Sequence, residues 1–171
     1  MRCVFQYTLG IAAVVQATVA VRVVSAQASG QHACSLFQPA ELIQLTKRKD
    51  IGNQGPQPSG PPELAKGTTE CDFVNVSVTL TENMTPAWFT RDRGVTEKAT
   101  TRWKVQSVSG IGDEAYYMWD PRPGSDRSVG IVIRASGKRL SVGDTAPSDS
   151  IEAIKGMLLS IAKMTVPRVK Q

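Results

Sequence analysis

A pair of cysteines, Cys34 and Cys71, constrains the fold of this chain more than any other feature of its sequence. The third cysteine, Cys3, lies in an apolar leader that we expect to be removed, so these two remain as a pair. Two thiols in an oxidising compartment most simply form one bridge. Closing the loop between them contributes roughly 4 kcal/mol on a chain-entropy argument. The sequence therefore predicts one disulfide that ties the start of the domain to its middle.

Residues 1–26 have the parts of a secretory signal peptide in order. Arg2 gives a positive start, an uncharged apolar run follows over 9–20, and small residues allow cleavage after Ala26 or Ala28. Polar residues keep the apolar run shorter than the about 20 residues of a membrane helix, although an uncleaved anchor is the alternative. We therefore expect an exported protein, periplasmic or secreted, with no integral membrane segment after cleavage.

The remaining sequence predicts one domain of the α+β class. We expect a flexible N-terminus over 27–33, the domain over 34–165 and a basic tail over 166–171. The architecture expected is a two-layer fold, with a mostly antiparallel sheet of about five strands and helices packed chiefly on one face. Helices are predicted to begin at Pro39, Pro86 and after Asp149. The predicted strands span 72–81, 103–108, 115–119, 129–133 and 138–143, with a Gly/Pro-rich loop over 52–67.

The segment Gly110-Ile111-Gly112-Asp113-Glu114-Ala115 matches the pattern G-x-G-x-x-A. In a dinucleotide site those glycines follow a strand and open a helix, whereas here a strand is predicted on each side. We interpret the segment as a structural turn in which Gly110 and Gly112 adopt positive φ and Asp113 binds backbone N–H groups. The two strands that flank it are expected near the middle of the sheet.

The sequence predicts no catalytic set, no metal site and no cofactor. The only histidine, His32, lies in the expected flexible N-terminus, and the neighbouring thiol is expected to be oxidised. A non-enzymatic protein is therefore favoured. The alternative is an extracytoplasmic hydrolase that uses carboxylates, with Asp113 and Glu114 as the first residues to test.

The charge pattern of the sequence favours neither nucleic acid nor a strongly anionic surface as a binding partner. The net charge of +5 falls to +3 when Arg2 and Arg22 leave with the leader. No basic arm or aromatic-interleaved motif of a nucleic-acid reader is present in the sequence. The one sizeable basic cluster comprises Arg91, Arg93, Lys98, Arg102 and Lys104. It leaves open a weak binder of anionic surfaces.

Aromatic residues gather in the middle of the chain and suggest a binding surface. The possible ligand contacts are Trp88, Trp103, Tyr116, Trp119 and Arg102. Trp and Tyr beside a cation could hold a ring, a glycan or a partner side chain, although packing between sheet and helices is the alternative. The leading hypothesis is a binding or interaction module of the cell envelope or extracellular space, whose partner is an unknown envelope or extracellular protein or small ligand.

The order of these features resembles small exported bacterial proteins of uncharacterised function. Cys34-Ser35-Leu36-Phe37 leads into a helix, Cys71-Asp72-Phe73 follows a Gly/Pro loop, and the glycine turn comes next. This C…C…GxGDxA layout is similar to that of actinobacterial lipoprotein families and, more distantly, to the extracellular sensor domain of some mycobacterial Ser/Thr kinases. The resemblance implies no catalytic residues. The polar residues 31–33 stand where a lipobox would be apolar, so no lipid is expected on Cys34.

Overall fold

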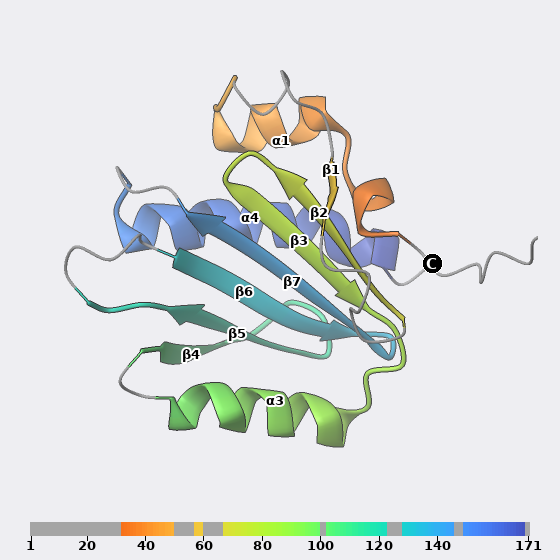
Figure 1. The fold of residues 1–171 in the computed structure, drawn as a ribbon, viewed down its shortest axis with the longest axis vertical. Helices are drawn as coiled ribbons and strands as arrows, with labels where there is room; N and C mark the ends of the chain where they lie inside the picture. Colours follow the sequence, from red (N-terminus) through yellow and green to blue (C-terminus); the bar gives the residue numbers. More distant parts are fainter. Residues whose placement is uncertain are drawn as a thin grey trace, which may run out of the picture.

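The computed structural model describes residues 32–49, 57–59, 67–99, 102–122, 128–145 and 149–169. In that part of the chain, seven strands form one antiparallel sheet in the order β1-β2-β3-β7-β6-β5-β4 (Figure 1). The strands are β1 (Gln57–Ser59), β2 (Thr68–Phe73), β3 (Val76–Thr81), β4 (Lys104–Val108), β5 (Glu114–Trp119), β6 (Ser128–Ala135) and β7 (Lys138–Thr145). The helical segments are η1 (Ala33–Leu36, a 3-10 helix), α1 (Pro39–Thr46), α3 (Pro86–Lys98) and α4 (Ile151–Val169). The predicted α+β class is confirmed.

The sheet is wider than predicted because a hairpin stands where one strand was expected. Residues 72–81 divide at a two-residue turn, Val74-Asn75, and Phe73 pairs with Val76 across it. The sequence has no glycine or proline at this position to indicate a turn. Val74 adopts a φ of 58°, which is costly for a β-branched residue. The three-residue strand β1 then adds to β2 from within the predicted irregular loop.

One face of the sheet carries the main hydrophobic core, beneath α4. This helix packs across β6 and β7, η1 packs on β2 and β3, and α1 packs against α4 (Figure 1). Ile131 and Ile133 point from β6 to Leu158 and Ile161 in this core, and all four are fully buried. The alternation predicted for residues 129–133 is therefore confirmed, with its apolar side toward the long helix.

The opposite face is covered only in part, by α3. Phe89 of this helix packs on Tyr116 of β5 and Val132 of β6, and these three residues form a separate small cluster. The aromatic rings of Phe89 and Tyr116 lie 5.5 Å apart. The fold therefore has three layers where α3 lies beside β4, β5 and β6, and two layers over β2, β3 and β7, where the sequence analysis expected two throughout.

Both ends of the domain extend beyond the predicted limits of 34 and 165. Ala33 is fully buried in η1, and His32 caps that segment by accepting a hydrogen bond at Nδ1 from the backbone N–H of Cys34. At the other end, α4 continues to Val169, which is also fully buried. Arg168 holds this last turn in place by donating to the backbone oxygen of Leu36 at 2.7 Å.

The predicted disulfide joins Cys34 to Cys71, with an S–S distance of 2.02 Å. It fastens η1 to the centre of β2, and a thiol held in this bridge cannot carry a lipid. Among the described residues, none of the helices combines the length and apolar character needed to cross a membrane. The predicted signal peptide lies outside the described residues.

The strands that flank the glycine turn do not lie in the middle of the sheet, as the sequence analysis expected. β4 is the edge strand and β5 is its only strand neighbour toward the centre. The centre is instead built by β7, which pairs with β3 on one side and β6 on the other. The sequence pattern identified the strands but held no information on their order across the sheet.

Candidate functional site

The part of the sheet that α3 leaves uncovered is rich in hydroxyl groups. Residues paired across antiparallel strands point to the same face, so the register identifies the side chains that share this surface. The rows contributed by β3 and β7 are Ser77–Gly143, Thr79–Ser141 and Thr81–Arg139. All six residues are half-buried. They form a polar floor beside α3.

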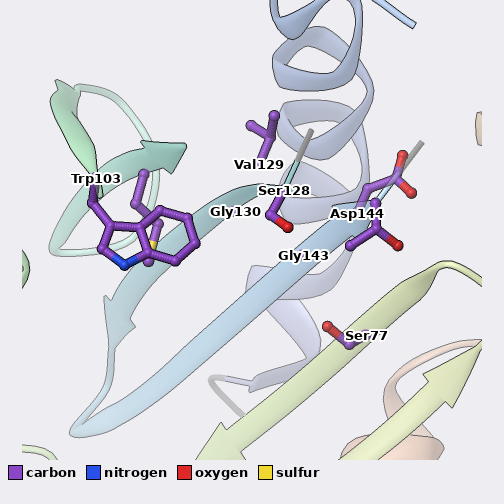
Figure 2. Close-up of a pocket in the computed structure, with 9 residues that line it drawn as sticks. Ser77, Trp103, Ser128, Val129, Gly130, Gly143 and Asp144 are labelled. Atoms are coloured by element: carbon purple, nitrogen blue, oxygen red, sulfur yellow. The ribbon is translucent and has the colours of Figure 1, made fainter. Parts of the chain in front are cut away.

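A pocket of about 230 Å³ opens at one end of this floor. Figure 2 shows Trp103 on one side of it and Ser77 on the other, with strands β6 and β7 between them. The lining residues are Ser77, Trp103, Met118, Ser128, Val129, Gly130, Gly143, Asp144 and Thr145. We call this the Trp103 pocket.

Two glycines leave the middle of the Trp103 pocket bare. Gly130 of β6 lies directly opposite Gly143 of β7 in the ladder. A Cβ atom on Gly143 would come within 3.1 Å of the Ser77 hydroxyl oxygen, and one on Gly130 would lie 3.4 Å from Cγ of Met118. Glycine inside a strand costs roughly 0.5–1 kcal/mol relative to alanine, and here the pair leaves the backbone between Ser77 and Met118 uncovered.

The end of α3 sets the position of Trp103. The backbone N–H groups of Arg102 and Trp103 both donate to the carbonyl oxygen of Ala99, which caps α3, at 2.9 and 3.0 Å. These two hydrogen bonds tie the residues before β4 to the end of α3 and hold the indole at the mouth of the pocket. The guanidinium carbon of Arg102 lies 5.3 Å from the centre of the same ring. A cation at this distance is attracted to the ring face.

The lining of the Trp103 pocket combines apolar surface with neutral hydrogen-bonding groups. Trp103 and Met118 supply the apolar wall, while Ser77, Ser128 and Thr145 each carry a hydroxyl group. A hydroxyl group can donate and accept. This combination suits a ring-shaped molecule with one apolar face and polar groups at its edge.

The other aromatic residues named from the sequence do not share this pocket. Tyr116 is fully buried beneath α3, and Trp88 is 59 % exposed in the first turn of that helix. Trp119 points to the opposite face of the sheet, where Nζ of Lys155 lies 3.8 Å from its ring centre. The structure thus brings Arg102 to Trp103 and separates the other three rings from them.

Tyr116 belongs to a polar network that fastens α3 to the sheet. Its hydroxyl group donates to Asp92 of α3 at 3.2 Å, and Nε of Arg139 donates to the same carboxylate oxygen at 3.0 Å. Burial raises the pKa of Tyr116 to about 12, and the negative charge of Asp92 adds to this effect. The phenol is therefore a neutral donor at physiological pH, which suits a structural role.

The glycine turn is built as a brace between β5 and the β6–β7 hairpin. Gly110 and Gly112 both have positive φ, and a Cβ on Gly112 would lie 2.5 Å from a methyl group of Ile133. Asp113 accepts hydrogen bonds from the backbone N–H of Ser136 and from Arg134. Glycine is therefore required here by both conformation and space.

The two carboxylates proposed for hydrolysis share one cation at this turn. Arg134 contacts Asp113 at 3.2 Å and Glu114 at 2.9 Å. Both carboxylates are well exposed, at 39 % and 43 % of their side-chain surface. One guanidinium therefore engages both carboxylates at an exposed turn. The described geometry gives this alternative no support.

The basic cluster divides between α3 and the start of β4. Arg91 lies over the ring of Trp88, and Arg93 pairs with Glu97 and lies over the ring of Tyr116. Lys98 and Lys104 are exposed. Since three of its arginines lie over aromatic rings of the same chain, the cluster does not present five unengaged cations to an anionic surface.

The described residues contain no group of three or more His, Cys, Asp or Glu side chains that could hold a metal ion. Asp144 of the Trp103 pocket is directed by its register to the α4 side, where Oδ1 accepts from Arg48 at 2.9 Å. Burial raises the pKa of Asp144, and Arg48 opposes that rise. This carboxylate supports the end of β7 rather than the pocket floor.

Sequence reasoning missed most of the pocket. It identified Trp103 and Arg102, but not the glycine pair, Ser77 or Met118. A signal was present, because glycine inside a predicted strand indicates close approach of another group. In comparisons with known proteins, no family model, no curated protein and no solved structure matches this chain.

Proposed function

We propose that this chain is an exported, non-enzymatic binding domain whose Trp103 pocket takes a small, neutral, ring-shaped ligand. One observation carries the proposal: two glycines face each other across β6 and β7, so no side chain covers the strands beside the indole wall of Trp103. At Gly130 a purely structural sheet face would gain stability from alanine, whose Cβ would lie 3.4 Å from Cγ of Met118. A glycine kept at this position favours a role in which another molecule lies on the uncovered backbone.

The chemistry of the lining favours a neutral ligand over a charged one. The side chains that face the pocket by register are apolar or carry hydroxyl groups, and the one acidic residue in its lining is paired with Arg48 on the other face. A charged ligand would lose its hydration without gaining an opposite charge. A ring with hydroxyl or amide groups would stack on Trp103 and hydrogen-bond at its edge.

Export is the second part of the proposal. The leader over 1–26 and the Cys34–Cys71 bridge support it, since such a bridge persists in oxidising compartments. Mass spectrometry of the protein recovered from its source tests this part directly. The expected result is a chain that begins at Gln27 or Ser29 and has no free thiol. An intact leader with two reduced cysteines would overturn it.

Ligand-observed NMR tests the pocket with glucose, N-acetylglucosamine and phenol as neutral ring probes. Saturation transfer to at least one probe is expected, and Gly130→Ala should abolish it because the added methyl group occupies the pocket floor. Gly156→Ala is the matched control, because a Cβ there meets nothing within 4 Å and it lies on α4, away from the pocket. Transfer to none of the probes, or equal transfer in both variants, would refute the binding role.

A further inference from the structure

The uncovered face continues beyond the Trp103 pocket to a second hollow at the other end of the same strands. This hollow has a volume of about 370 Å³ and lies beside the first half of α3. Its lining residues are Thr68, Thr81, Met84, Trp88, Arg91, Asp92, Val95 and Arg139. We call it the Trp88 groove.

The register of β3 and β7 places the two hollows in line. The row Thr81–Arg139 lies in the Trp88 groove, and the row Ser77–Gly143 lies in the Trp103 pocket. Between them is the row Thr79–Ser141, whose two hydroxyl-bearing residues are half-buried. Four residues of extended strand span about 13 Å, so the combined floor is longer than a single sugar ring.

Helix α3 forms one side of this path along its length. Trp88, Arg91, Asp92 and Val95 follow the i, i+3, i+4, i+7 spacing that marks one side of a helix. Trp88 and Val95 are 59 % and 64 % exposed, and they are the two large hydrophobic side chains that stand out on the described surface. Exposed apolar residues along a concave path indicate an interaction surface.

We propose that the Trp103 pocket and the Trp88 groove bind one linear, neutral oligosaccharide, with an indole ring at each end of the path. This inference rests on the proposed function and names the class of ligand. Sugars present apolar C–H faces that pack on tryptophan and hydroxyl groups around their edges. The floor between the indoles offers hydroxyl groups from Ser77, Thr79 and Ser141, which can donate to or accept from such a chain.

The charges along the path support a neutral ligand. Asp92 and Arg139 form an ion pair at 3.0 Å, and the guanidinium of Arg91 lies over the ring of Trp88. Glu70 and Asp72 share this face from β2, on the side away from α3. Because cations and anions alternate across the surface, a polyanion would meet repulsion as well as attraction.

An extended peptide is the competing occupant, and the floor is less suited to it. Backbone groups in the middle of a sheet already pair with neighbouring strands, so a peptide lying across them would find no free ladder partners. It would depend on side-chain hydroxyl groups alone. An oligosaccharide uses those hydroxyl groups directly, which is why the geometry favours it.

Isothermal titration with N-acetylglucosamine, its dimer and its trimer tests the inference. The trimer should bind the native chain about tenfold or more tightly than the monosaccharide, because it reaches both indoles. Trp88→Ala and Ser141→Ala should each reduce this gain while leaving monosaccharide binding unchanged. Thr90→Ala, exposed on α3 but outside the groove lining, is the matched control and should change neither.

The outcomes separate this inference from the proposed function. Loss of all binding in Gly130→Ala, together with a length dependence that Trp88→Ala removes, is the expected result. If the monosaccharide binds in a Gly130-sensitive way without any gain for the trimer, the oligosaccharide inference fails and the pocket stands. If neither N-acetylglucosamine nor its trimer binds, the oligosaccharide inference fails, and so does the proposed function for sugar ligands. Tighter binding of a Ser-Gly repeat peptide of similar length would replace the oligosaccharide by a peptide.

Discussion

The two faces of the sheet differ in how completely they are covered, and the difference separates stability from binding. On the α4 face, apolar side chains from five strands pack against a long helix and are closed at one end by the disulfide. On the α3 face, three buried residues make a small cluster, and the neighbouring strands present hydroxyl groups and two glycines. The first face holds the fold together, and the second leaves room for another molecule.

Removing the disulfide is the strongest way to challenge the α4 face. We expect Cys34→Ser/Cys71→Ser to lower the free energy of unfolding by roughly 4 kcal/mol, because the unfolded chain loses its closed loop. Urea denaturation of the mature protein, with and without reductant, measures this. If reductant leaves the midpoint unchanged, the bridge contributes little and the α4 face owes its stability to packing alone.

Neighbouring residues of β6 provide a direct comparison of the two faces. Ile131 points to the α4 face and Val132 to the α3 face, and both are fully buried. Ile131→Ala should cost about 2–5 kcal/mol because it leaves a cavity in the main core. Val132→Ala should cost about 2 kcal/mol from the loss of two methyl groups in the smaller cluster. Equal losses in chemical denaturation would contradict the contrast between the faces.

An ion pair at the end of α4 gives the α4 face a dependence on pH. Hydrogen bonds from Arg168 and from the backbone of Gln38 lower the pKa of Glu41 to about 2, below its ordinary value of 4.5. A carboxyl with a lowered folded-state pKa contributes stability above pH 4.5 and loses it as the pH falls toward 2.

The variant Arg168→Ala isolates this contribution. At neutral pH the loss should be about 1 kcal/mol or less, since the pair is partly exposed. The difference in unfolding free energy between the native chain and Arg168→Ala should shrink as pH falls from about 4.5 to 2. Thermal unfolding at several pH values measures it, and Arg168→Lys serves as the charge-preserving control. A difference that stays constant over this range would show that Arg168 acts through its bond to Leu36 alone.

The smallest effect is expected on the α3 face, and its sign is informative. Gly130→Ala should raise the free energy of unfolding by about 0.5 kcal/mol, because alanine is less flexible in the unfolded chain and its Cβ fits at ordinary contact distance. Gly143→Ala should destabilise instead, since its Cβ crowds the Ser77 hydroxyl group, and Ser77→Ala should relieve that crowding. A destabilising Gly130→Ala would mean that the glycine is needed for the fold itself.

Local sequence patterns predicted many of the strands and turns of this fold. Features that depend on which strands lie side by side could not be predicted in this way. Alternating apolar residues located β6 and β7, and Ser136-Gly137 was correctly predicted as the two-residue turn between them, because glycine is typical of the second position of such turns. The turn at Val74 was missed, because a β-branched residue there contradicts local preference and is held by pairing on both sides.

The candidate site was harder to predict because its parts come from four strands that are distant in the chain. Gly130 and Gly143 face each other only through the β6–β7 register, and Ser77 joins them only because β3 lies beside β7. Aromatic composition pointed to Trp103 but equally to Trp119, which lies on the other face. Side chains alternate between the two faces along each strand. Which residues of different strands meet on one face depends on the strand order, and the sequence did not reveal that order.

A backbone hydrogen bond from the segment between β3 and α3 has a consequence for the position of the helix. The N–H of Met84 donates to the oxygen of Gly137 at 2.6 Å, so the chain is pinned to the tip of the β6–β7 hairpin just before the helix begins. At the far end of α3, the carbonyl oxygen of Ala99 accepts from the backbone N–H groups of Arg102 and Trp103. Backbone hydrogen bonds therefore hold both ends of α3, and they fix the separation between its first turn and Trp103 along the uncovered face.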